Sequence, residues 1–201
     1  MDYCTVEQLR EMLSDAGSSL PASLLQRAVT AASRAVDVWC NVPAGSFAPS
    51  SAPAPRLFRA CDSTLLEVDP FGALDGLAVE LDADGDGVFE TSLSASDVVP
   101  EPLNADSAGD AFAWTALAVA DPYSWPVGGV RPGVRVTARW GYSAVPADVE
   151  QATLIRAAAL FKRKESPHGV AEFGEFGPVR ISRNDPDVMA LLERYRRWTV
   201  V

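Results

Sequence analysis

The chain has 201 residues, 48% of them hydrophobic, and a formal net charge of −10 at pH 7. The hydrophobic fraction is ordinary for a globular protein, and no run approaches the roughly 18 unbroken apolar residues that a membrane helix needs. Three cysteines without a CxxC pair predict reduced thiols rather than a disulfide framework. Since the first residues lack the pattern of a secretory signal, we expect a protein of the cytosol with no membrane partner.

The charge is distributed unevenly along the chain. Residues 1–150 hold 8 Lys/Arg and 21 Asp/Glu, whereas residues 151–201 hold 9 and 6. An acidic body repels phosphates, which argues against tight DNA binding as the main task. A basic C-terminal end suits charge-guided docking to a partner or a neighbouring copy, and a merely solvated surface is the equally weighted alternative.

The first forty residues predict two helices. Thr5 and Gln8 fit a capping box at the start of a short helix that places Val6, Leu9 and Leu13 on one face. A longer amphipathic helix follows over roughly residues 22–40. The proline-rich residues 43–55 then predict a linker that marks a domain boundary.

Short runs typical of β-strands follow, separated by Gly, Pro, Asp and Ser. The clearest alternation is at residues 134–140, where Val134 and Val136 oppose Arg135 and Thr137. Six such runs predict a small antiparallel sandwich or barrel. They are Leu57–Cys61, Thr64–Val68, Leu77–Leu81, Val88–Leu93, Phe112–Val119 and Val134–Trp140.

Helical sequence returns after Pro146, with an apolar run over residues 152–161, a possible short strand at Val179–Ser182, and a last helix capped near Asp185. The N- and C-terminal helices can bury their apolar faces only against each other. We therefore predict an α+β fold, with a helical core of residues 1–54 and 143–201. Residues 55–142 form an inserted small antiparallel β domain.

The sharpest local motif is Asp82–Gly87, in which Asp82, Asp84 and Asp86 alternate with small residues. This spacing matches the opening of a calcium loop, where carboxylates converge on a hard cation. The match ends there, because Leu93 occupies the twelfth position, where a calcium loop requires a bidentate Glu. The flanking residues also resemble strands, whereas a calcium loop of this kind lies between helices. An ordinary hairpin turn is the favoured interpretation, and a weak Ca²⁺ site on the three aspartates is the alternative.

Other catalytic and metal motifs are missing from the sequence. His168 is the only histidine, which cannot furnish the usual zinc sites and is more typical of a turn. There is no Walker loop, no GxSxG elbow and no marked carboxylate pair. We therefore expect no enzyme and no cofactor apart from the possible Ca²⁺. A calcium-dependent binding module on residues 56–142 and a small hydrolase using dispersed carboxylates are the rival hypotheses.

The C-terminal third carries a more specific pattern. Its elements are Trp140-Gly141-Tyr142, Val145–Val149, Leu160–Arg163, Ser166–Val170, Gly174 to Gly177, Val179-Arg180, Asp185–Val188, Leu191-Leu192 and Tyr195. This order resembles the head-to-tail connector (adaptor) proteins of tailed bacteriophages. The resemblance spans the whole chain and is concentrated over residues 140–197.

The resemblance implies a structural virion protein of the neck, assembled in the host cytoplasm. Such proteins form a homo-oligomeric ring, usually of twelve copies, beneath the portal protein. They have a helical core, with a β domain inserted in the longer members, and the other side of the ring meets a head-tail stopper or tail protein. Genome DNA passes through the central channel without sequence-specific binding, and no substrate is turned over.

The resemblance also implies that the C-terminal segment contacts the portal. The end of this chain is both basic and apolar, and a frayed terminus is the alternative interpretation. The predicted portal-binding residues are Arg194, Arg196, Arg197, Trp198, Val200 and Val201. The β insertion has no assigned task, and it could widen the ring, touch the capsid's inner edge or meet tail proteins.

Overall fold

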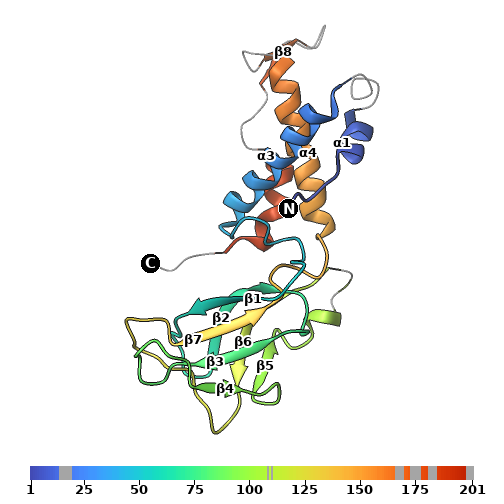
Figure 1. Ribbon diagram of the computed structural model, residues 1–201. Coiled ribbons are helices and arrows are strands. Elements are labelled where there is room, and N and C mark those ends of the chain that lie inside the picture. The colour runs from blue at the N-terminus through green and yellow to red at the C-terminus, as the bar shows by residue number, and fades with distance from the viewer. Residues whose placement is uncertain are drawn as a thin grey trace. The chain divides into compact units, whose positions relative to one another are not determined.

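The computed structural model describes residues 1–13, 20–107, 109, 111–165, 170–172, 178–180 and 185–197 (Figure 1). The chain divides into two compact units. A helical unit combines Met1–Gly45 with Ala147–Val201, and a β unit consists of Ser46–Pro146. The predicted α+β fold is confirmed.

The helical unit is built on two long helices, α3 (Ala22–Cys40) and α4 (Ala147–Glu165). The shorter helices α1 (Val6–Leu13) and α5 (Pro186–Leu192) pack on α4, and the single turn η3 (Glu193–Tyr195) follows α5. Two short strands, β8 (Val170–Glu172) and β9 (Pro178–Arg180), pair with each other. None of the helices that the structure describes is long and apolar enough to cross a membrane.

The core of the helical unit joins the two ends of the chain, as the sequence predicts. It is formed by Leu9, Leu13, Leu25, Val29, Ala32, Leu154, Ala157, Ala158 and Phe161. The predicted capping box is present, because the Thr5 amide donates to Gln8 Oε1 at 2.7 Å and the Gln8 amide donates to Thr5 Oγ1 at 3.1 Å. Asp185 caps α5 by accepting from the Asp187 amide at 3.0 Å.

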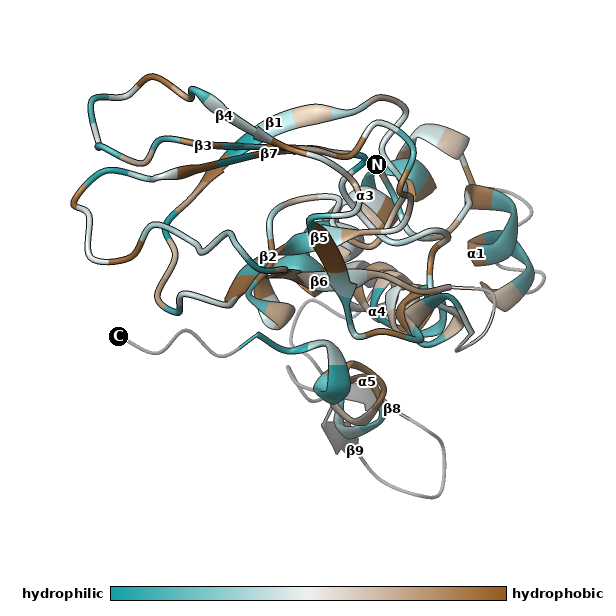
Figure 2. Ribbon diagram, turned by 90° about the horizontal axis from the view of Figure 1, so that it is seen from below, coloured by the Kyte–Doolittle hydropathy of each residue, from teal (hydrophilic) through white to brown (hydrophobic). Residues whose placement is uncertain are grey.

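The β unit is a two-layer antiparallel sandwich, seen nearly edge-on in Figure 2. One sheet has the strand order β1-β7-β3-β4, and the other has the order β2-β6-β5. The first sheet contains β1 (Ala54–Phe58), β7 (Val134–Ala138), β3 (Ala78–Leu81) and β4 (Thr91–Leu93). The second contains β2 (Leu65–Phe71), β6 (Trp114–Val119) and β5 (Val98–Glu101), and a turn η1 (Ala105–Ser107) follows β5.

All six predicted runs contribute strands, with shifted ends, and the run over residues 134–140 keeps its predicted alternation. Val134, Val136 and Ala138 are fully buried, whereas Arg135 and Thr137 are partly exposed. The sequence did not predict β5. This strand contains Pro100 and lies at a sheet edge, where a missing amide donor is tolerated.

The proline-rich segment differs from the linker that the sequence predicts. Phe47 is 1% exposed, so the segment packs into the β unit instead of spanning water. Its backbone is also paired, since the Ser50 amide donates to the Trp140 carbonyl at 2.9 Å and the Tyr142 amide donates to the Ser46 carbonyl at 3.3 Å. The β unit therefore begins at Ser46 rather than residue 55 and ends at Pro146 rather than residue 142.

Gly141 allows the backbone of the proline-rich segment, at Ala48, to lie against the backbone that follows β7. It has φ of +103°, and a Cβ atom there would lie 2.0 Å from the Ala48 carbonyl oxygen. We expect Gly141→Ala to lower the free energy of unfolding by at least about 3 kcal/mol, because it combines an unfavourable φ with a backbone clash. Urea unfolding followed by tryptophan fluorescence measures this loss.

Gly128→Ala is the matched control for this substitution. Gly128 has φ of +82°, but nothing lies within 4 Å of the added Cβ. We expect this variant to lose only about 1 kcal/mol, the cost of the left-handed backbone alone. Equal losses in the two variants would contradict the close approach of Ala48 to Gly141.

Candidate functional site

The acidic loop between β3 and β4 is organised around Asp82. Its side chain is buried, at 2% exposure, and accepts from the Gly85 amide at 2.7 Å and the Gly87 amide at 2.9 Å. Val79 of β3 pairs with Leu93 of β4, so the segment is a β-hairpin, as the favoured interpretation has it. The turn is thus stabilised by its own first aspartate.

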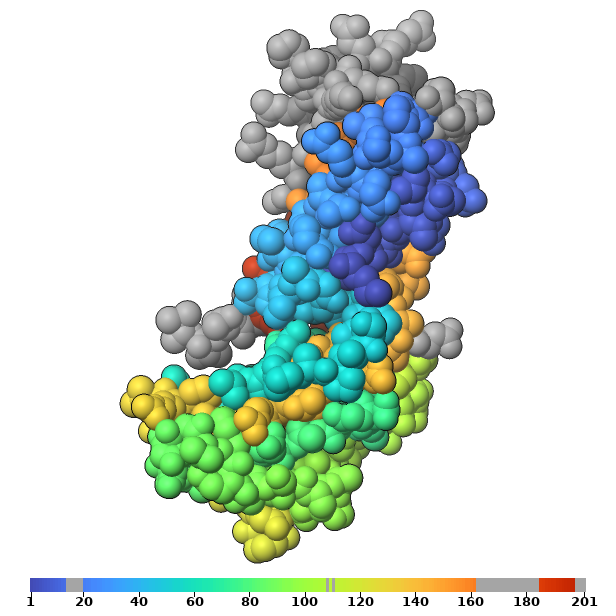
Figure 3. Space-filling model, in the orientation of Figure 1, coloured from blue at the N-terminus to red at the C-terminus, as the bar shows by residue number. Residues whose placement is uncertain are grey.

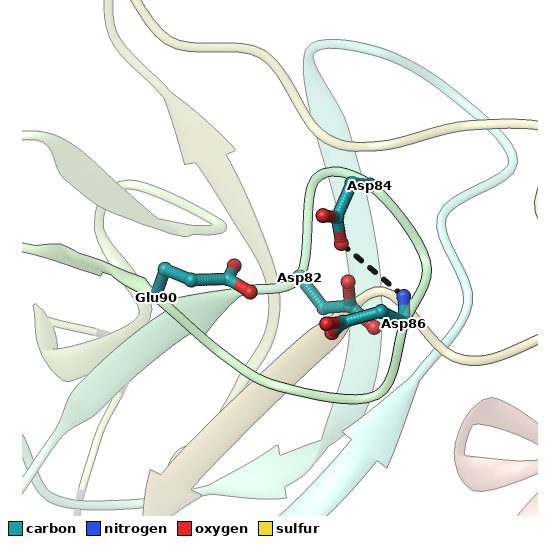
Figure 4. A group of neighbouring side chains, drawn as sticks. All are labelled: Asp82, Asp84, Asp86 and Glu90. Carbon is teal, nitrogen blue, oxygen red and sulfur yellow. Dashed lines mark hydrogen bonds between the residues drawn. The ribbon is translucent and has the colours of Figure 1, made fainter.

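Four carboxylates also converge at this turn (Figure 4). Asp82, Asp84, Asp86 and Glu90 each offer one oxygen, and these oxygens all lie within 4.8 Å of one another. Ligands on opposite sides of a Ca²⁺ ion are about 5 Å apart, because each lies 2.3–2.6 Å from the ion. The loop therefore has the dimensions of a calcium site, although it lacks the Glu at the twelfth position. Glu90, at the ninth position, is the fourth carboxylate that the predicted ligand set does not include.

Arg194, the first predicted portal-binding residue, is engaged within its own unit. Its guanidinium lies 2.9 Å from a carboxylate oxygen of Asp148, in the first turn of α4. It also donates to the Tyr195 hydroxyl and lies 4.7 Å from the centre of that ring. With 69% of the Arg194 side chain exposed, the ion pair contributes at most about 1 kcal/mol to stability.

Arg196 and Arg197 lie at the C-terminal end of α3. The Arg196 guanidinium is 5.3 Å from the centre of the Trp39 ring, which is a cation–π contact. The Arg197 amide donates to the Cys40 carbonyl at 2.9 Å, and the Arg197 carbonyl accepts from Asn41 Nδ2 at 3.3 Å. The chain after η3 thus satisfies a terminal carbonyl of α3, which has no partner within its own helix.

The predicted portal-binding residues are therefore of two kinds. Arg194, Arg196 and Arg197 fix the C-terminal segment to α4 and α3. Trp198, Val200 and Val201 lie outside the described residues. Sequence reasoning gave no sign of Trp39 or Asp148 as partners, because contacts over more than forty residues leave no periodic signal.

A buried carboxylate, Asp37, organises the other side of the helical unit. It is 3% exposed and accepts from the Tyr3 hydroxyl and, at 3.3 Å, from the Gly45 amide. Arg34 lies 3.0 Å away on the same helix. Burial raises the pKa of Asp37, while the Tyr3 hydrogen bond, Arg34, the Gly45 amide and the terminal ammonium group act in the opposite direction.

The two cysteines of the helical unit are unsuited to nucleophilic chemistry. Burial, with the nearby Glu150 and Asp2 carboxylates, raises the pKa of Cys4 to about 11. Burial and the Asp37 carboxylate raise the pKa of Cys40 to about 12. Both therefore remain protonated thiols at neutral pH, whereas thiolates are the reactive form.

The helical unit with an inserted two-sheet sandwich is a fold found in phage-like necks. One similar solved structure is described as the neck of a native GTA (gene transfer agent) particle computed with C12 symmetry. The identity is 23%, the TM-score is 0.51, and the match covers 98% of this chain and 90% of that chain. A second is the neck of an empty GTA particle computed with C6 symmetry, with 21% identity, a TM-score of 0.55 and the same coverage.

At these identities the likeness establishes a shared fold, and it extends over both units. The chain therefore has the fold of a phage-like neck protein, in agreement with the resemblance in its sequence. No protein-family model matches the chain, and no curated protein matches it either.

The raised pKa of Asp37 predicts a pH-dependent stability. The folded state holds this proton more tightly than the unfolded state, so the contribution is fully present below the unfolded pKa of about 3.9. It is lost as the pH rises through the raised folded pKa. Asp37→Asn cannot titrate, so we expect wild type to lose stability relative to the variant between pH 3.5 and 7.

Urea unfolding of both proteins across this pH range measures the difference. Because every other carboxylate titrates in both proteins, their contributions cancel in the comparison. A stability difference that is independent of pH, or that moves in the opposite direction, would contradict the raised pKa.

Proposed function

We propose that the chain is a structural ring subunit of a virion neck, a head-to-tail connector that joins the portal to the neck or tail. The observation that carries this proposal is the full-length match of the fold to chains from two neck structures. The sequence pattern over residues 140–197 supports it independently. In this role the protein turns over no substrate and resides in the virion neck.

The symmetry of the similar structures supports a ring. They are described as necks computed with C12 and C6 symmetry, and a twelve-copy ring agrees with both. Ring subunits use heterologous contacts that close by rotation, so each copy needs two different faces. We propose a ring of twelve copies, with the portal on one side and a stopper or tail protein on the other.

The charge distribution suits a channel through which DNA passes. The β unit holds 5 Lys/Arg and 14 Asp/Glu, a net charge of −9, whereas the helical unit is close to neutral. Acidic surfaces do not release counterions from DNA, so they do not hold the duplex. In this proposal the genome crosses the ring without sequence-specific binding.

The C-terminal segment is the proposed portal contact. Arg194 and Arg196 hold the start of the segment against the helical unit, and residues 198–201 supply Trp and Val side chains. Aromatic and apolar side chains next to arginines are typical anchors of protein interfaces. The described residues up to Arg197 thus hold the start of the segment in place.

We expect replacement of residues 198–201 by Gly-Ser-Gly-Ser to abolish stacking on portal particles while leaving rings intact. The reason is that the replaced residues carry the apolar anchors, whereas the ring contacts lie elsewhere. Mass photometry measures ring formation, and negative-stain imaging of the protein mixed with portal particles of the same phage measures stacking.

Arg10→Ala is the control, because it changes an arginine of α1 far along the chain from the segment. It should leave both rings and stacking unchanged. A wild-type protein that stays monomeric and ignores the portal under all conditions would contradict the connector proposal. Stacking that survives the replacement would contradict only the role of residues 198–201.

A second candidate function is a calcium-dependent binding module, favoured by the convergence of Asp82, Asp84, Asp86 and Glu90. In this case the three aspartates and Glu90 would hold Ca²⁺ through carboxylate oxygens, the ligands that this hard cation prefers. The ion would neutralise part of the net charge of −9 on the β unit.

We expect Ca²⁺ at a hundred times its dissociation constant to stabilise the protein by about 2.7 kcal/mol, because it binds only the folded loop. Thermal unfolding in the presence of CaCl₂ or EDTA measures the shift. Asp84→Asn with Glu90→Gln should remove the response while sparing Asp82, which the turn requires. An unchanged melting temperature in wild type would leave the hairpin turn as the whole role of this loop.

A further inference from the structure

The two outer faces of the β sandwich differ in chemistry. On the four-stranded sheet, Arg135 forms two hydrogen bonds with Glu80, at 2.7 and 2.6 Å, and Arg139 pairs with Asp75 at 3.0 Å. These charged side chains are thus paired within the β unit. The three-stranded sheet β2-β6-β5 has one ion pair among the described residues, between Asp69 of β2 and Arg56 of β1 at 2.5 Å, and none of the ion pairs involves Glu67 of β2 or Glu101 of β5.

Strand register places an apolar row across the outer face of the three-stranded sheet. Leu65 of β2 pairs with Ala118 of β6, and Ala118 pairs with Val99 of β5. Leu65 is 42% exposed and Val99 is 38% exposed, so the two large side chains of the row are open to solvent. Part of β5 is brown in Figure 2, in agreement with the two valines of this strand.

The next row of the same face is acidic. Glu67 of β2 and Glu101 of β5 lie on either side of Ala116 of β6. Adjacent strands are about 4.8 Å apart, so the two glutamates are separated by about 10 Å, too far to share one metal ion. Neither carboxylate pairs with a cation among the described residues. The face therefore combines exposed apolar area with two negative charges that are not neutralised.

The helical unit carries a face of complementary chemistry on α3. Arg27, Ala31 and Val38 lie on one side of the helix, opposite its buried stripe, and all three are exposed. Val38 is 80% exposed. Figure 3 shows that α3, in blue to light blue, forms much of the visible surface of the helical unit.

Arg27 is distinctive among the exposed arginines that the structure describes. Arg59 donates to the Val130 carbonyl, Arg131 donates to the Asp86 carbonyl and Arg194 pairs with Asp148. Arg27 has no such hydrogen bond or ion pair among the described residues. It is thus an exposed cation available to an external carboxylate.

We propose that the exposed face of α3 in one copy packs on the outer face of β2-β6-β5 in the next copy. Val38 contacts the row of Leu65 and Val99, and Arg27 pairs with Glu67 or Glu101. This inference rests on the proposed ring, and it specifies the contact that builds the ring.

The dimensions of the two faces agree. Arg27 and Val38 are eleven residues apart, which is about 16 Å along a helix that rises 1.5 Å per residue. The diagonal from Val99 to Glu67 crosses two strand spacings and two residues of rise, about 12 Å in all. The long arginine side chain covers the remaining difference.

The two faces are different surfaces of the same chain, so their contact is heterologous. Each copy offers α3 to one neighbour and the sheet to the other, which is the arrangement that a closed ring needs. A two-fold dimer, in contrast, would bury the same face of both copies. The acidic row also excludes DNA as the occupant, because glutamates repel phosphates.

Charge reversal tests the pairing in the full-length protein. We expect Arg27→Glu, and separately Glu67→Lys with Glu101→Lys, to weaken association between copies at least tenfold, measured by mass photometry over a concentration series. Combining all three substitutions restores opposite charges across the contact and should recover rings. Recovery is specific to the pairing, since a merely destabilised copy would not be rescued by a third change.

Two controls separate the contact from general electrostatics and from folding. Asp106→Lys with Asp121→Lys makes the same change of net charge at exposed positions of the β unit and should leave rings intact. Val38→Ser removes an exposed side chain, so it should weaken rings severalfold without lowering the melting temperature.

Rings that persist in the reversed variants, a triple variant without recovery, or a Val38→Ser protein that assembles normally would each overturn this contact. These outcomes leave the proposed neck function standing, because the wild type still forms rings. A wild type that forms no ring overturns both.

Discussion

The fold depends on the burial of α3 against α4. These helices lie more than a hundred residues apart in sequence, yet the apolar stripe of each is covered chiefly by the other. Burial of apolar side chains is the dominant favourable term in folding, and neither stripe finds enough partners within its own end of the chain. The helical unit therefore closes only when both ends of the chain meet, and residues 46–146 are necessarily an insertion between them.

This long-range pairing explains how the termini are used. Tyr3 and Arg34 meet at Asp37 on one side of α3. At the end of the same helix, the Cys40 carbonyl receives the Arg197 amide. Both ends of the chain thus satisfy polar groups of the helix that organises the core, since buried or terminal groups left without partners would be costly.

Sequence periodicity was sufficient to predict the helices and strands that bury one face. The structure has the predicted alternation at Val134–Ala138 and the predicted helical stripe of residues 22–40, because each follows a local repeat. The missed strand β5 contains Pro100, which argues against a strand except at an edge, and edge position is a property of the whole sheet.

The candidate sites show the same division between local and long-range information. The Asp82–Asp86 spacing is local and was visible in the sequence, and Glu90 joined it because the hairpin bends back. The Arg196–Trp39 contact joins residues at opposite ends of the chain, so it became visible only after α3 and α5 were placed in one unit. Prolines of residues 43–55 suggested a linker, yet Phe47 is buried, because an aromatic side chain outweighs the local preference of its neighbours.

The acidic β unit imposes a constraint on any assembly of this chain. Copies that each carry a net charge of −9 on one unit repel one another, and at physiological salt this repulsion is screened only beyond about 8 Å. The β unit contains five arginines. Two of them, Arg135 and Arg139, already pair with acids of the same copy. Cations outside the β unit therefore favour attraction between copies. The helical unit is nearly neutral and presents exposed arginine, so it is suited to supply these cations. The difference in charge between the two units is therefore a condition for ordered association of copies.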